Sequence, residues 1–104
     1  MDEQTADALL TELIGWGLVE ERSDEIGPTR RWSARVQATS ERINLDVART
    51  GTYPQGNPLV LLIATALREE RPGLEGARFD DAVRMLVTLE VARMKPELRA
   101  RYGF

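Results

Sequence analysis

The first apolar residues of the chain recur every three or four positions between Asp2 and Gly15. This spacing places them on one face of a helix, so it predicts an amphipathic helix over these residues. The glycines of Gly15-Trp16-Gly17 are typical of a helix end, because glycine adopts the left-handed conformation that stops a helix.

The same helical spacing returns in two later segments, Leu59–Arg71 and Phe79–Met94. Asn57-Pro58 is a typical helix start, with a capping side chain followed by proline in the first turn. Pro72-Gly73 is a typical end. We expect Phe79–Met94 to be the longest helix and Pro96 to open one further turn.

A different period, two residues, marks the segment Arg31–Ala38, where apolar and polar positions alternate. Alternation is typical of a half-buried strand. The segment Leu18–Arg22 also suits a strand, and the residues Ser23–Thr29 between them are rich in turn formers. Together these segments predict a β-hairpin with a long loop.

The segment Arg42–Arg49 is compatible with two structures. Its apolar positions alternate, which favours a third strand. A short helix is the alternative, capped by Ser40, with Ile43 and Val47 on one face and a stop near Gly51. The alternation makes the strand the preferred interpretation.

These elements predict one α+β domain over residues 1–104. Its N-terminal helix and an antiparallel sheet of two or three strands pack against two longer C-terminal helices. A hydrophobic content of 42% suits a packed core. The start of the chain is acidic rather than basic and apolar, and the longest apolar stretch, Leu59–Leu67, is too short to cross a bilayer. We therefore expect a cytoplasmic protein without a membrane partner.

The chain contains neither histidine nor cysteine. This composition removes thiol and imidazole chemistry and the usual zinc ligands. Carboxylates remain, but they occur as adjacent pairs such as Glu69-Glu70 and Asp80-Asp81, whose side chains diverge on a helix. We expect no enzyme activity, no catalytic or metal-binding residues and no cofactor.

A helix, the step Gly15-Trp16-Gly17-Leu18-Val19 and a hairpin resemble the recognition helix and wing of the winged-helix family over residues 5–40. The family's two preceding helices have no counterpart in the printed sequence. The resemblance implies nucleic-acid contact through the arginines of the hairpin region, which are Arg22, Arg30, Arg31, Arg35 and Arg42. Residues 1–21 contain six carboxylates and no cation, and their charge would repel phosphates.

The loop after Thr50 raises a third hypothesis, a small-ligand site. Gly51 and Gly56 have the glycine spacing of a phosphate-binding loop, and a predicted helix follows. Asn57 and Pro58 stand where such a loop has lysine and a hydroxyl residue, so the motif is incomplete.

The two C-terminal helices carry more apolar surface than a thin α+β domain can cover, which indicates self-association. The candidate interface residues are Leu59, Leu62, Ile63, Met85, Val91 and Met94. The sequence therefore favours a non-enzymatic interaction or adaptor domain that forms a homodimer. The alternatives are a winged-helix regulator and a domain that binds a small ligand through Gly51–Gly56.

Overall fold

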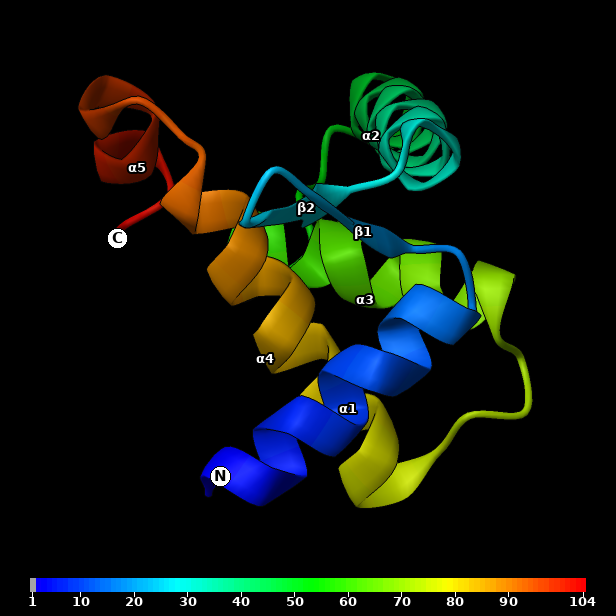
Figure 1. Cartoon of the computed structure of the whole chain (residues 1–104). Helices are drawn as coiled ribbons and strands as arrows, with labels where there is room; N and C mark the ends of the chain where they lie inside the picture. The colour runs from blue at the N-terminus through cyan, green and yellow to red at the C-terminus, as the bar shows by residue number, and fades with distance from the viewer. Residues whose placement is uncertain (1) are drawn as a thin grey trace.

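Five helices and one two-stranded antiparallel sheet make up the computed structural model, which describes residues 2–104 (Figure 1). The elements in chain order are α1 (Glu3–Gly15), β1 (Val19–Arg22), β2 (Glu25–Pro28), α2 (Arg30–Thr50), α3 (Pro58–Glu70), α4 (Gly76–Ala92) and α5 (Pro96–Arg101). The predicted α+β class is confirmed.

The core lies where α1, α3 and α4 meet beneath the hairpin. In Figure 1, α1 crosses in front of α4, and α3 lies behind the strands. Strand β1 packs on α1 and β2 packs on α4. The fully buried side chains include Leu13, Leu18, Trp32, Ile63 and Leu67. Burial of such side chains is the main favourable contribution to folding.

Helix α1 ends at Gly15 as predicted and begins at Glu3, one residue after the predicted start. Asp2 caps it, because its carboxylate accepts a 2.7 Å hydrogen bond from the backbone N–H of Thr5. This bond favours the charged carboxylate and holds the pKa of Asp2 below its usual value. After the helix, Gly17 takes a left-handed φ of 74°, and the chain turns into β1.

The hairpin is shorter than predicted. Its strands pair from Val19 opposite Pro28 to Arg22 opposite Glu25, so only Ser23 and Asp24 form the turn. Both turn residues have positive φ, 48° and 68°, which matches the twist of a tight hairpin. The second strand therefore comes from the segment that the sequence predicted to be loop.

The prediction of a strand over Arg31–Ala38 is wrong, because these residues begin α2. Thr29 caps this helix by accepting a 3.1 Å hydrogen bond from the backbone N–H of Trp32. Trp32 is buried, while Ala34 and Ala38 are exposed. The alternating pattern thus belongs to a helix with its aromatic residue inside and its alanines outside.

The preferred strand over Arg42–Arg49 is also wrong; these residues are helical, as in the alternative, but they belong to a long helix and not to a short one capped by Ser40. Helix α2 runs on without a break, so Ser40 lies within it rather than at its start. The helix ends at Gly51, as that alternative predicted. The φ of Gly51 is 72°, and its N–H donates a 2.8 Å hydrogen bond to the carbonyl of Val47. With 21 residues α2 is the longest helix, and α4, predicted to be longest, has 17.

Helix α3 begins at Asn57-Pro58 as predicted. The Asn57 side-chain oxygen accepts a 2.9 Å hydrogen bond from the N–H of Leu59. Its amide nitrogen donates a 2.6 Å bond to the carbonyl of Tyr102, just after α5. Arg99 of α5 donates a 2.9 Å bond to the carbonyl of Val91 in the last turn of α4. These two side chains fix the C-terminal segment to the body.

Candidate protein-interaction surface

Three of the arginines predicted to contact nucleic acid form ion pairs that link α2 to α3. Arg31 and Arg35 pair with Glu70, and Arg42 pairs with Glu69. The Nε–Oε2 distance between Arg35 and Glu70 is 3.3 Å, and the Glu70 side chain is only 10% exposed. These ion pairs link the two helices, and the three arginine side chains remain 42–55% exposed.

The other two predicted contacts lie elsewhere. Arg22 is on the hairpin and pairs with Glu20 at 2.8 Å. Arg30 is exposed at the start of α2. The five arginines therefore do not form one face. The hairpin itself holds one arginine against four carboxylates, which are Glu20, Glu21, Asp24 and Glu25.

Five of the six predicted self-association residues lie in the core or pack against it. Leu59 and Ile63 are buried inside it and are not available to a second copy. Met85, Val91 and Met94 are partly buried and pack against the core. Leu62 is partly buried and lines a surface groove next to α2. The chain's own elements therefore cover much of the apolar surface that the sequence predicted for self-association.

The predicted ligand loop is used for helix ends. Gly51 stops α2, and Asn57 caps the first amides of α3. A phosphate at a helix start is held by those same amides. Since the Asn57 side chain already accepts from Leu59 and Val60, the position is occupied. Residues 51–57 also contain no cation to balance an anionic ligand.

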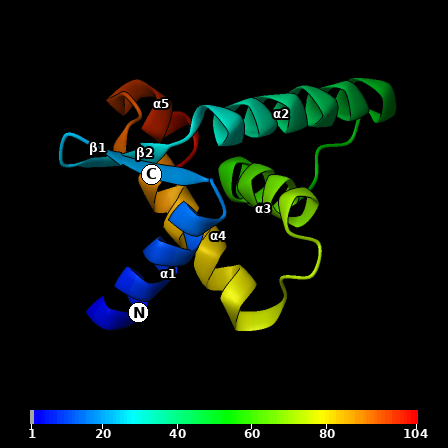
Figure 2. The ribbon, with the colours of Figure 1, turned by 45° about the vertical axis from the view of Figure 1, so that its right-hand side comes forward.

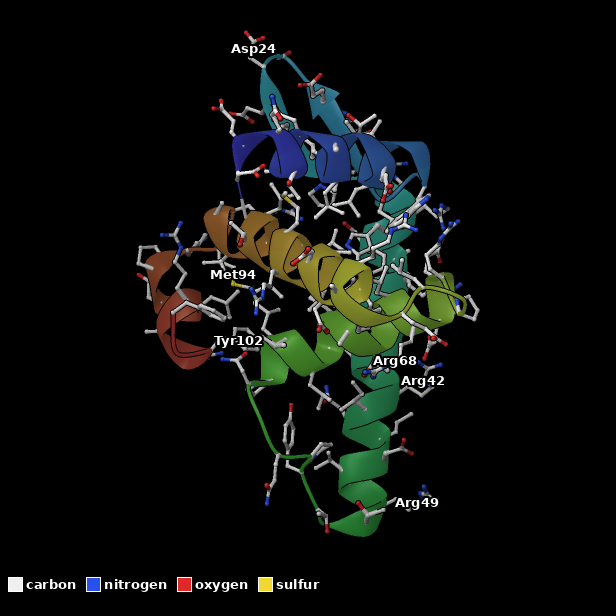
Figure 3. All side chains as sticks on the ribbon, turned by 90° about the horizontal axis from the view of Figure 1, so that it is seen from below. Asp24, Arg42, Arg49, Arg68, Met94 and Tyr102 are labelled. Atoms are coloured by element: carbon white, nitrogen blue, oxygen red, sulfur yellow. The ribbon has the colours of Figure 1, made fainter. Side chains whose placement is uncertain are left out.

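Exposed apolar side chains lie instead on the side of α2 that faces away from the body. Helix α2 runs along the periphery of the molecule, and its second half extends beyond the other elements (Figure 2). Figure 3 shows the same extension, with Arg42 near the crossing with α3 and Arg49 at the far end. The second half therefore has little of the body beside it.

The exposed residues on this side of α2 are regularly spaced. They recur at intervals of three and four, which places them in one row on the helix. We call this row the α2 outer face; it consists of Ala34, Ala38, Glu41, Leu45 and Ala48, all exposed. Leu45 is 69% exposed, more than any other large hydrophobic side chain in residues 2–104. The opposite face carries Trp32 and Val36 towards the core.

The second half of α2 is also a poor helix by composition. Ile43, Val47 and Thr50 are β-branched, and Asn44 and Asp46 favour caps and turns over helix interiors. Most helical stability in proteins comes from packing of an amphipathic face. A projecting segment with such low propensity gains from a partner that covers its outer face.

A shallow groove follows the inner side of α2. One part, of about 110 Å³, lies between α2, the 51–57 loop, the start of α3 and Tyr102, and it includes Ile43 and Tyr53. A second part, of about 320 Å³, shares Ser40 and Leu62 with the first. The loop residue Tyr53 thus partly covers the inner side, whereas the outer face is bare.

Within residues 2–104, no three carboxylates gather as metal ligands would. None of the described helices is both long and apolar enough to span a membrane. Searches of family models, curated proteins and solved structures give no match to the chain.

The residues of the α2 outer face were missed at the sequence level. Their signal was present, because Ala34, Ala38, Leu45 and Ala48 have the helical spacing of three, four and seven. It was hidden by the assignment of strands to the same residues, since a strand distributes these positions differently between its two faces.

Proposed function

We propose that this protein is a non-enzymatic interaction domain that acts as a homodimer through the α2 outer face. The observation that carries the proposal is the exposure of Leu45 in the middle of the projecting half of α2. Removing one leucine side chain from water is favourable by about 1.5–3 kcal/mol. In a symmetric dimer this gain occurs twice.

The neighbours of Leu45 support contact with another helix. Ala48 lies one turn away on the same face. Small side chains let a second helix approach closely, so that Leu45 is enclosed on several sides. The partner would also stabilise the second half of α2, which has low helix propensity of its own.

The proposal is tested by sedimentation equilibrium over a range of chain concentrations up to about 0.1 mM, where even weak dimers form. We expect the average mass to rise towards twice that of one chain. Leu45→Glu places a charge in the interface, so this variant stays at the mass of one chain. Circular dichroism checks that the variant keeps its helices.

Leu98→Glu is the matched control. Leu98 is also exposed, at 38%, but lies on α5 outside the α2 outer face. We expect this variant to associate like the unmodified protein. A single-chain mass at every concentration would overturn the proposed function, and so would equal loss of association in both variants.

A further inference from the structure

We infer that the two copies pack their α2 helices antiparallel, with Leu45 of each copy meeting at the two-fold axis. This inference rests on the proposed homodimer and adds its direction and register. It rests on the charged residues that flank Leu45 along the helix. The residue four positions before Leu45 is acidic, and the residue four positions after it is basic.

The two charged residues four positions from Leu45 have opposite signs. Glu41 precedes Leu45 and Arg49 follows it, and both lie on the same side of the helix as Leu45. In an antiparallel pair centred on Leu45, Glu41 lies opposite Arg49 of the second copy, and symmetry repeats the pair. A parallel pair would place Glu41 opposite Glu41 and Arg49 opposite Arg49, and like charges repel.

Both side chains are available for this contact. Glu41 is exposed and has no ion pair among residues 2–104. Arg49 pairs with Asp46 at 3.3 Å, but both side chains are largely exposed, at 77% and 65%. Exposed pairs of this kind contribute little to stability, so Arg49 exchanges partners at small cost.

The body of each copy leaves room for this arrangement. The α2 outer face is opposite the face that carries Trp32 and Val36 into the core. Each body therefore lies behind its own α2, on the far side from the second copy. Arg42 also remains with Glu69 of its own chain, at the flank of the contact.

The contact is small. Centred on Leu45, the end of α2 at Thr50 of one copy is level with Ser40 of the other, so the helices overlap for about 16 Å at 1.5 Å per residue. Stable complexes bury about 800 Å² on each partner, and one short helix seam covers less. The dimer is therefore weak and depends on chain concentration.

Charge reversal tests the direction of the helices. Glu41→Arg places arginine opposite Arg49 at both ends of the contact, and we expect the dimer dissociation constant to rise about tenfold. Arg49→Glu has the same effect. The double variant Glu41→Arg/Arg49→Glu restores opposite charges only in the antiparallel pair, so its dissociation constant returns to the original value. Glu97→Arg on α5 is the control and leaves the constant unchanged.

Disulfide trapping tests the register, and the chain suits it because it has no native cysteine. Leu45→Cys meets its own counterpart at the axis and forms a disulfide-linked dimer under mild oxidation. Ala38→Cys lies about 21 Å from its counterpart along the antiparallel pair, beyond the reach of a disulfide. A mixture of Glu41→Cys and Arg49→Cys gives crosslinks that neither variant forms alone.

The possible failures separate the two proposals. If the unmodified protein dimerises and Leu45→Glu prevents it, but the double charge variant stays weak or Ala38→Cys crosslinks with itself, the antiparallel inference is overturned and the proposed homodimer stands. A protein that remains a single chain at all concentrations overturns both.

Discussion

The corner between α1 and β1 shows how a single residue links three helices. The Trp16 carbonyl accepts a 2.5 Å hydrogen bond from Arg31 of α2. The Trp16 ring lies under the guanidinium of Arg71, at 4.5 Å from its centroid. The next residue, Gly17, has a φ of 74°. A Cβ added to Gly17 would lie only 3.1 Å from Nη2 of Arg31. Side chains other than hydrogen are therefore unfavourable at position 17.

We predict that Gly17→Ala lowers the free energy of unfolding by about 1–2 kcal/mol. The left-handed φ accounts for most of the loss, because Arg31 can move its flexible end. Urea denaturation followed by circular dichroism measures the change.

Gly15→Ala is the control at the same corner. Gly15 is the last residue of α1, has helical φ, and has open space where a Cβ would lie. Alanine should raise the unfolding free energy by about 0.5–1 kcal/mol. Equal effects at the two positions would contradict the role given to the Gly17 conformation.

Residue-level signals in the sequence were reliable where they depend on local backbone chemistry. Asn57-Pro58 predicted the start of α3, and Gly51 marked the stop in the helical alternative for α2. Such signals depend on a few neighbouring atoms, so they can be read from a few residues. The ion pairs between α2 and α3 are not local, and nothing in the sequence connects Arg35 with Glu70.

At the scale of elements, α2 shows why the strand prediction failed. Trp32, Ala34, Val36 and Ala38 alternate with polar residues, but alanine suits the exposed side of a helix as well as a strand. A helical row through Trp32, Val36 and Thr39 was present in the same residues. A two-residue turn at Ser23-Asp24 completed the hairpin earlier and left these residues free to form the helix.

The α2–α3 contact gives the prediction at this scale. Glu70 is mostly buried and receives both Arg31 and Arg35. Glu70→Gln removes the charge that these guanidinium groups face, so we expect a loss of about 1–2 kcal/mol in unfolding free energy. Thermal and urea denaturation measure it.

Glu20→Gln provides the comparison. Glu20 pairs with Arg22 on the hairpin, where the Arg22 side chain is largely exposed. Its loss should change stability by less than about 0.5 kcal/mol. If the two glutamine variants are equally stable, the arginines of α2 do not depend on Glu70 and are free for other partners.

At the scale of the whole molecule, the distribution of charge bears on the nucleic-acid hypothesis. The chain carries 17 acidic and 14 basic residues. Residues 2–21 have no cation, so α1 and the start of the hairpin present only carboxylates. The nucleic-acid hypothesis needs these elements to approach phosphates, which they would repel.

We therefore predict no salt-dependent binding to DNA. Fluorescence anisotropy with a labelled random duplex at low ionic strength should show no change up to the highest chain concentration. Electrostatic binding to duplex DNA weakens steeply as salt rises. A complex that forms at low salt and dissociates at moderate salt would contradict this prediction and support the winged-helix alternative.

Asn57 has a consequence for how the second half of the chain unfolds. One side chain both starts α3 and holds the carbonyl of Tyr102. Release of the segment around α5 thus removes a restraint from the cap, and fraying of the cap frees that segment. The two events are thermodynamically linked and cooperative, although Asn57 and Tyr102 are 45 positions apart in the sequence. A force or partner that pulls on the C-terminal segment therefore also loosens the cap at the first turn of α3.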